Sequence, residues 1–235
     1  MIKIVNQTAT AEIYISGDIV DDAEGNIARE FFQSTDGFEF PRELKRQLDE
    51  VKDKDLTIYI NSYGGSVPAG IAMANMINRH NGHTTAIVDG FCCSIATQIF
   101  FSADSCKMNR NAYLMIHKPT VEINGNADEL RKAAETLDTI QRGLESVYQQ
   151  KKIAGVTDAE ITEMMNAETW LNSNKAIQYF DIELINSAVM KNCAGNLKKL
   201  KSLNFKNIPS KLKFEDETIQ KIEISLALAE GAIIE

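Results

Sequence analysis

Ser94 and His117 are the two side chains whose positions in this sequence suggest nucleophilic chemistry. Ser94 lies in the segment VDGFCCSIATQ, between an apolar run typical of a buried strand and an apolar run typical of a helix. A serine hydroxyl is a poor nucleophile by itself and needs a neighbouring base. His117 ends the apolar run AYLMIH, and Lys118-Pro119 follows and stops that strand. The pair predicts acyl transfer, provided that the fold brings the two side chains together.

A glycine pair follows another predicted strand, in the segment SYGGS. Gly64 and Gly65 have no side chains, so the backbone can approach a ligand closely and direct its N–H groups toward it. An oxyanion hole requires such donors. Phosphate-binding loops also use glycines, but the lysine and the threonine or serine of the Walker motif are missing here.

Each of these features also has a structural interpretation. Ser94 could cap the following helix, and His117 could be a hydrogen-bonded histidine of the core. His80 and His83 flank an Asn-Gly turn, which favours surface positions, and no carboxylate or cysteine set completes a metal site with them. Cys93 is an alternative nucleophile, although buried thiols are usually inert. We expect no metal and no cofactor.

Strands and helices alternate along the chain that must position these residues. Period-two or continuous apolar runs predict strands at 12–19, 56–61, 84–91, 106–108 and 112–117. Helical spacing predicts helices from Pro41, over 67–80, over 93–104 and over 126–153, whereas 20–39 shows no clear pattern. This order predicts an α/β fold with a mostly parallel sheet, whose loops gather at one edge where chemistry usually takes place.

Composition narrows the class of protein. The 235 residues carry a formal net charge of -8, which argues against a general nucleic-acid binder. Four cysteines without a CxxC pair favour reduced thiols in a cytosolic compartment. We find neither a signal-peptide pattern nor an apolar run long enough to span a membrane.

The character of the chain changes near residue 190. Residues 191–214 carry lysines without a single acidic residue, and residues 215–235 are acidic and apolar. We expect one domain over 1–189 and a C-terminal extension over 190–235, made of a flexible basic linker and a terminal helix. A docking or cleavable segment is the alternative interpretation.

Three segments resemble the ClpP family, the proteolytic subunit of Clp proteases. INSYGGSVPAGIAMANMI resembles the family segment INSPGGSVTAG, DGFCCSIATQIFFSAD resembles GMAASMGAFLLAAG, and LMIHKP resembles MIHQP. Their order and approximate spacing also match, and the resemblance covers roughly residues 10–188. The divergent start and the C-terminal extension are more similar to the ClpP-related proteases of phages and prophages, which act in head maturation.

The resemblance implies a role for each matching residue. Ser94 matches the nucleophile and His117 matches its base. The backbone N–H groups of Gly65 and Ile95 match the two oxyanion donors, and Gly64 belongs to the same substrate-binding turn. Cysteines stand before Ser94 where the family has alanines, and this change removes neither nucleophile nor base.

The third member of the triad depends on a weaker match. ETWLNSNKAIQYFDIE resembles the family segment DRFLSAEEAxEYGLID. This alignment matches Trp170 with the phenylalanine of the family segment and Glu168 with its aspartate. Asp181 is an alternative partner for His117, a Ser–His dyad is another, and a helix-capping role for Glu168 also stays open. Tyr63 replaces the family proline of the glycine turn, and Phe180 replaces a glycine.

The resemblance also implies a fold, an assembly and partners. It implies repeated crotonase-like ββα units, and it makes 126–153 the handle helix that interdigitates two rings. We therefore expect a ring-shaped homo-oligomer, a heptamer or a double ring, that cleaves proteins or peptides in a bacterial cytoplasm or a phage prohead. An AAA+ ATPase or phage capsid proteins are the implied partners. Two alternatives stay open: a crotonase-like acyl-CoA enzyme and a non-catalytic capsid assembly scaffold.

Overall fold

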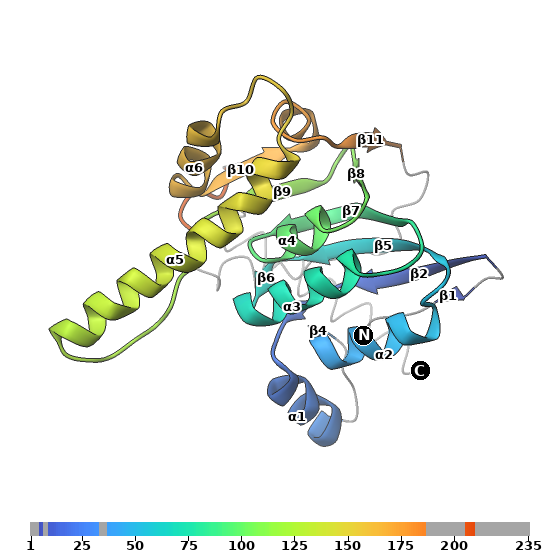
Figure 1. Cartoon of the computed structure of the whole chain (residues 1–235), viewed down its shortest axis with the longest axis horizontal. Coiled ribbons are helices and arrows are strands. Elements are labelled where there is room, and N and C mark those ends of the chain that lie inside the picture. Colours follow the sequence, from blue (N-terminus) through green and yellow to red (C-terminus); the bar gives the residue numbers. More distant parts are fainter. Residues whose placement is uncertain (1–4, 7–8, 33–36, 187–204, 210–235) are drawn as a thin grey trace, which may run out of the picture. The chain divides into compact units, whose positions relative to one another are not determined.

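The computed structural model describes residues 5–6, 9–32, 37–186 and 205–209 of the chain. The chain divides into two compact units, Met1–Cys193 and Ala194–Glu235. All the helices and strands that are described belong to the first unit (Figure 1). The basic linker and the terminal helix expected over 190–235 lie outside the described residues, except for 205–209, which form neither a helix nor a strand.

One large sheet forms the centre of the first unit (Figure 1). Its main path runs β1-β2-β5-β7-β8-β11, and β9 pairs with both β7 and β10. The strands are β1 (Val5–Asn6), β2 (Thr10–Ile15), β5 (Asp55–Ser62), β7 (Thr84–Cys93), β8 (Ser105–Asn109), β9 (Tyr113–Ile116), β10 (Thr169–Asn172) and β11 (Glu183–Ile185). Within the described residues, only the β1–β2 and β9–β10 pairs of this sheet are antiparallel. The prediction of a mostly parallel sheet is confirmed.

Helices pack on this sheet and complete the core. They are α1 (Asp22–Phe32), α2 (Pro41–Glu50), α3 (Val67–Asn78), α4 (Ala96–Phe101), α5 (Ala127–Lys151), α6 (Asp158–Asn166) and α7 (Ser173–Ala176). Figure 1 shows α2, α3 and α4 together on one face of the strands. Ile58 and Ile60 of β5 and Met73 and Ile99 of these helices are fully buried in one apolar cluster. Removal of such side chains from water is the main force that fixes the sheet against its helices.

A small second sheet carries the glycine pair. It consists of β4 (Phe38–Glu39), β3 (Asp18–Ile19) and β6 (Gly64–Gly65), in the order β4-β3-β6. The strand expected over 12–19 is therefore two strands, β2 and β3, which are separated at Gly17. Parallel pairing of Ile19 with Gly65 fixes the glycine pair against β3.

Helix α5 is the long helix that the sequence predicts. Asn126 and Glu129 form a capping box at its start, which explains why the helix begins there. Leu144 and Tyr148, in its second half, are buried, whereas Leu130 in its first half is 44% exposed. The first half projects away from the sheet in Figure 1. The apolar stripe is thus covered along only part of its length within one chain.

Two local predictions differ from the structure. The helix expected over 93–104 is only α4, Ala96–Phe101, because the cysteines before Ser94 belong to β7. A continuous apolar run does not by itself distinguish a buried strand from a buried helix. The patternless stretch 20–39 contains α1, a mostly exposed helix in which Ala28 is buried. None of the described helices combines the length and apolarity needed to cross a membrane.

Candidate active site

Ser94 occupies the turn that joins β7 to α4. Its backbone φ is 55°, in the left-handed region that residues other than glycine rarely adopt. The N–H of Ser94 donates to the carbonyl of Met115 in β9 at 2.8 Å, and the N–H of Thr97 donates to the carbonyl of Ser94 at 3.0 Å. Backbone strain of this kind persists only where surrounding bonds hold it, and it is common at active sites. Hydrogen bonds on both sides of Ser94 hold the strained turn here.

His117 follows β9 and lies against the Ser94 hydroxyl. Cys93 pairs with Met115 in the parallel β7–β9 ladder, so the residues that follow these two strands emerge at the same edge. Nε2 of His117 lies 2.7 Å from Oγ of Ser94, which is hydrogen-bonding distance. The structure thus brings together the two side chains on which the sequence prediction depends.

The surroundings of His117 keep its imidazole neutral near pH 7. Burial lowers the pKa of His117 below its ordinary value of 6.5, because desolvation disfavours the charged form. The negative charge of Glu168 acts in the opposite direction and raises the pKa of His117. A neutral imidazole next to a hydroxyl can accept its proton, and a nearby carboxylate can then stabilise the imidazolium.

Glu168 lies beside His117, just before β10. Because Thr169 pairs with Ile116 in the antiparallel β9–β10 ladder, Glu168 and His117 flank the same end of that ladder. Glu168 is only 9% exposed, and Nε1 of Trp170 donates to its Oε1 at 3.5 Å. The backbone φ of Glu168 is 49°, again in the left-handed region. The resemblance placed Glu168 in the triad, and the structure places it where its charge acts on His117.

Asp181, the alternative carboxylate, lies in a different part of the unit. It is exposed, and its N–H donates to the carbonyl of Lys151 at the end of α5, at 3.0 Å. Burial raises the pKa of Cys106 to about 11, a rise that the Lys151 charge opposes and the Asp181 charge increases. Asp181 therefore acts on Cys106 in β8, whereas Glu168 acts on His117.

The glycine pair lies directly against the Ser94 turn. A Cβ atom on Gly64 would come within 2.8 Å of the Cys93 carbonyl oxygen and of Ser94 Cβ. On Gly65, a Cβ atom would collide with the carbonyl of Ile19. The φ angles of the two glycines are 100° and 146°, which side chains also disfavour. Only glycine fits at these two positions.

Two backbone N–H groups beside Ser94 are suited to bind an anion. Within the described residues, no group accepts the N–H of Ile95, which directly follows Ser94. The N–H of Ser66 donates to Ile19 at 2.7 Å. Since successive N–H groups of an extended strand point to opposite sides, the N–H of Gly65 points away from β3. The pair predicted as oxyanion donors thus belongs to two segments that pack on each other at Ser94.

Ser62 is a residue of this site that the sequence analysis missed. Its hydroxyl donates to the carbonyl of Gly17 at 2.5 Å and accepts the N–H of Gly64 at 3.1 Å. Ser62 is 2% exposed, and it ties the glycine turn to the segment before β3. Its position two residues before the glycine pair was the available signal, because serine side chains often bond the backbone two residues on.

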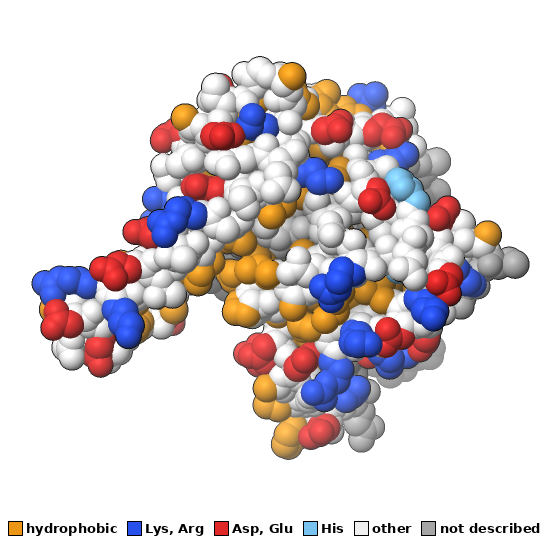
Figure 2. Space-filling model, in the orientation of Figure 1, with side chains coloured by type: hydrophobic (Ala, Val, Ile, Leu, Met, Phe, Trp, Pro, Cys, Tyr) orange, Lys and Arg blue, Asp and Glu red, His pale blue; other side chains and the backbone are white. Residues whose placement is uncertain are grey.

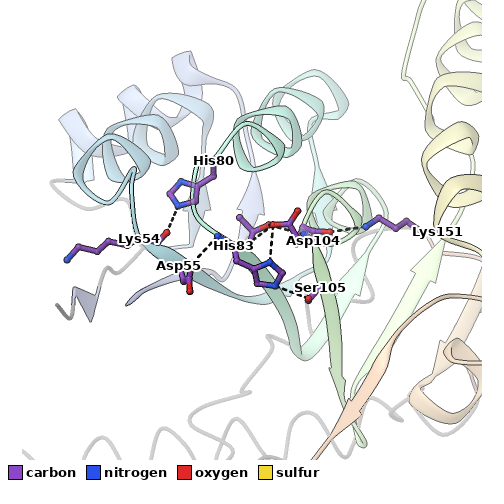
Figure 3. A network of polar contacts seen from close by, with 9 residues as sticks. Lys54, Asp55, His80, His83, Asp104, Ser105 and Lys151 are labelled. Atoms are coloured by element: carbon purple, nitrogen blue, oxygen red, sulfur yellow. Dashed lines mark hydrogen bonds and ion pairs between the residues drawn. The ribbon is translucent and has the colours of Figure 1, made fainter. Parts of the chain in front are cut away.

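The other two histidines precede β7, whereas Ser94 follows it. Figure 3 shows the polar contacts that His80 and His83 make. Nε2 of His83 lies 3.0 Å from Ser105 Oγ, and its Nδ1 lies 3.6 Å from Asp104 Oδ2. His80 contacts the carbonyl of Lys54 through Nε2 at 2.7 Å. The group formed by Ser105, His83 and Asp104 resembles a triad in residue type, but the side chains of His83 and Asp104 are 56% and 57% exposed.

The cysteine before Ser94 is poorly suited to act as a nucleophile. Cys92, Cys93 and Cys106 are free and buried. Burial raises the pKa of Cys93 far above its usual range, and the charge of Glu168 raises it further. A thiol needs its anionic form to react, so this environment disfavours chemistry at Cys93.

Comparison with known proteins agrees with this geometry. A model of the family described as Clp protease matches residues 45–188, which include Gly64, Gly65, Ser94, His117 and Glu168. The chain belongs to the Clp protease family. The match begins in α2 and ends after β11, so it spans the helical face of the sheet and the elements that meet at Ser94.

Several Clp protease subunits are similar to this chain. It is 30% identical over 132 residues to an ATP-dependent Clp protease proteolytic subunit from Chlorella vulgaris, and 32% identical over 136 residues to one from Streptococcus pyogenes. These matches cover 55% and 56% of this chain. The chain spans about two thirds of the length of these curated relatives, 65% and 68% respectively.

A solved Clp protease structure shares the fold. A ClpP1 mutant from Listeria monocytogenes superposes with a TM-score of 0.58 and 21% sequence identity. The superposition covers 75% of this chain and 92% of the Listeria chain. The predicted ClpP-like fold, including the long handle helix, is confirmed.

Proposed function

We propose that this Clp protease family member is a serine endopeptidase in which Ser94 attacks a peptide carbonyl. The observation that carries the proposal is the distance of 2.7 Å between His117 Nε2 and Ser94 Oγ. As Ser94 Oγ bonds to the carbonyl carbon, its proton moves to His117 and the carbonyl electron pair moves to the oxygen. His117 then donates that proton to the leaving amine as the C–N bond breaks. Water hydrolyses the resulting ester with the same base.

The surrounding groups have distinct roles in this proposal. The N–H groups of Gly65 and Ile95 bind the oxyanion, and each such donor contributes about 3 kcal/mol to lowering the barrier. Glu168, whose side chain is largely buried, stabilises the imidazolium of His117 through its negative charge. Gly64 leaves room for the Ser94 turn.

A fluorogenic peptide and an unfolded protein substrate test the proposal. The Ser94→Ala and His117→Ala variants are expected to lose cleavage by at least about a thousandfold, because nucleophile and base act as one unit. A phosphonofluoridate is expected to modify Ser94 in the parent and no residue in Ser94→Ala. Cleavage by Ser94→Ala at the parental rate would refute the assignment.

Ser105 and His83 offer a matched control on the same chain. They form another serine–histidine pair, with 3.0 Å between Ser105 Oγ and His83 Nε2, but the His83 side chain is 56% exposed and the Asn-Gly turn before it has a single glycine instead of a glycine pair. Ser105→Ala and His83→Ala are expected to retain parental cleavage. The same assays separate the alternatives. A crotonase-like enzyme would act on acyl-CoA without requiring Ser94. A non-catalytic scaffold would assemble normally, and the phosphonofluoridate would not modify its Ser94.

We further propose that the active form is a ring-shaped homo-oligomer, heptameric or doubled. The first half of α5 projects with Leu130 exposed, and Val121 and Ile123 just before it are 54% and 50% exposed. A groove of about 650 Å³ between α3, α4 and α5 is partly apolar, and Figure 2 shows hydrophobic side chains gathered beside the α5 arm. Exposed apolar surface of this kind marks protein interfaces. Light scattering at micromolar concentration tests this: a monomer would contradict it.

The physiological setting is a further part of the proposal. The similarity to phage-type proteases supports head maturation in a bacterial cytoplasm or prohead, with capsid proteins or an AAA+ ATPase as partners. The change from the lysine-rich 191–214 to the acidic 215–235 supports a separate extension after a 1–189 peptidase domain. Intact mass over time, in the parent and in Ser94→Ala, tests whether the extension is removed by the protein itself.

A further inference from the structure

The carbonyl of Ser94 is held by a relay of two buried hydroxyl groups. The Thr97 hydroxyl donates to the Ser94 carbonyl oxygen at 2.5 Å, in addition to the backbone bond from the Thr97 N–H. The same Thr97 oxygen lies 2.6 Å from the hydroxyl of Tyr148. A threonine hydroxyl has one proton, and Thr97 donates it to Ser94. Tyr148 is therefore the donor to Thr97, and the relay runs from Tyr148 through Thr97 to Ser94.

This relay is shielded from water and rigidly packed. Thr97 is fully buried and Tyr148 is 2% exposed. The ring of Tyr148 packs edge-on to Phe101, with 5.9 Å between centroids, and at 6.3 Å from the ring of Phe180. Burial raises the pKa of Tyr148 to about 12 even though hydrogen bonds with Thr97 and Gln98 act in the opposite direction, so its hydroxyl keeps the proton that it donates. Hydrogen bonds in such an interior are stronger than in water and reinforce one another along a chain.

The held carbonyl belongs to the same peptide group as a proposed oxyanion donor. The peptide bond between Ser94 and Ile95 is planar, so the direction of the Ser94 carbonyl fixes the direction of the Ile95 N–H. Two hydrogen bonds to that carbonyl also draw electron density away from the nitrogen, which makes the N–H a better donor. The relay therefore acts on both the orientation and the strength of the Ile95 N–H.

We propose that Tyr148 and Thr97 are positioning residues that orient and polarise the Ile95 N–H toward the oxyanion of the transition state. This inference rests on the proposed peptidase function of Ser94. It gives α5 a direct connection to the site, because Tyr148 lies in the second half of that helix, 51 residues from Thr97. An N–H group that stabilises the oxyanion only as negative charge develops in the transition state affects kcat, and its loss leaves KM nearly unchanged.

Three variants test the relay by steady-state kinetics on a fluorogenic peptide. Tyr148→Phe removes one hydroxyl and keeps the ring, and it is expected to lower kcat about tenfold, with KM within about twofold of the parent. Thr97→Val is expected to lower kcat by about a hundredfold, near the effect of losing one oxyanion donor. Thr97→Ser keeps the hydroxyl and is expected to restore kcat to within about threefold of the parent.

The double variant and a matched control complete the experiment. Thr97→Val/Tyr148→Phe is expected to lose no more kcat than Thr97→Val alone, because the relay reaches Ser94 only through Thr97. Thr162→Val is the control: Thr162 lies on α6, outside the α5 arm, and its hydroxyl donates to the carbonyl of Asp158 at 3.1 Å on an exposed surface. It is expected to leave kcat and KM unchanged.

The outcomes separate this inference from the proposed function. Parental kcat in Tyr148→Phe, together with inactive Ser94→Ala, would overturn the relay and leave the peptidase assignment intact. Equal losses in Thr97→Ser and Thr97→Val would also overturn it, because they would indicate packing rather than hydrogen bonding. If Thr97→Val fails to fold, Tyr148→Phe and Thr97→Ser still decide. Full activity of Ser94→Ala would instead refute the peptidase function itself.

Discussion

Ser94 and Glu168 are the only residues other than glycine, within the described part of the chain, whose backbone φ is positive, at 55° and 49°. Both act on His117: Ser94 Oγ lies at hydrogen-bonding distance from its Nε2, and the charge of Glu168, which flanks the β9–β10 ladder at the same end, raises its pKa. Each such conformation costs about 1–3 kcal/mol and persists only where the surrounding structure fixes it. Backbone strain in this domain is thus concentrated at the two neighbours of the proposed base.

The pH dependence of cleavage follows from the environment of His117. A base must be unprotonated to accept the Ser94 proton, so kcat/KM is expected to rise with pH through the pKa of the free enzyme's histidine. Burial places that pKa below 6.5, so the acid limb is expected below pH 6.5 and the plateau is reached by neutral pH. A pH–rate profile of kcat/KM measures this. A limb centred above 6.5 would contradict the prediction.

Replacement of Glu168 tests which carboxylate serves His117. Glu168→Gln removes a charge that raises the pKa of His117, so the acid limb is expected to move to lower pH. The plateau rate is expected to fall by roughly a thousandfold, because the imidazolium loses its stabilising charge. Asp181→Asn is the matched control, since Asp181 is exposed and acts on Cys106 instead. A larger loss in Asp181→Asn than in Glu168→Gln would reverse the assignment.

The glycine turn is expected to tolerate no side chain. Gly64→Ala would bring Cβ within 2.8 Å of Ser94 Cβ at a φ of 100°. We expect a loss of stability of about 1–3 kcal/mol and a fall in kcat of at least about a hundredfold. Gly143→Ala on α5 is the control, because no atom lies within 4 Å of its added Cβ. It is expected to stabilise the protein by about 0.5–1 kcal/mol in thermal unfolding.

Ser62 is expected to matter for the glycine turn more than for the fold as a whole. Ser62→Ala leaves the Gly64 N–H and the Gly17 carbonyl without their shared buried partner. The expected cost is about 1–3 kcal/mol of unfolding free energy, with a larger relative loss in kcat than in substrate affinity. Denaturant unfolding and steady-state kinetics on the same preparations measure both. An unchanged kcat would show that the turn holds its position without Ser62.

The buried cysteines of the described residues are expected to be unreactive in the folded protein. Cys92, Cys93 and Cys106 are buried, and burial raises the pKa of each thiol. Iodoacetamide at neutral pH is therefore expected to leave these three positions unmodified and cleavage intact, while a phosphonofluoridate abolishes cleavage. Peptide mapping by mass spectrometry identifies the modified positions. Rapid alkylation of Cys93 with loss of activity would support a thiol nucleophile instead.

The sequence by itself determined the order of the elements and the principal chemical groups. Apolar periodicity predicted β5, β7 and α3, and Asn126 with Glu129 explains the start of α5, because such signals act between residues close in the chain. The motifs around Ser94 and His117 were visible for the same reason. Glu168 came only from family resemblance, since a glutamate before a short strand has no distinctive local pattern.

The tertiary structure decided which of these groups meet. The 2.7 Å contact of Ser94 with His117 depends on the register of β7 against β9, and the place of Glu168 depends on that of β9 against β10. The bond between Thr97 and Tyr148 joins residues far apart in the chain. Strand register and helix packing arise from the burial of the whole core, which no local pattern encodes.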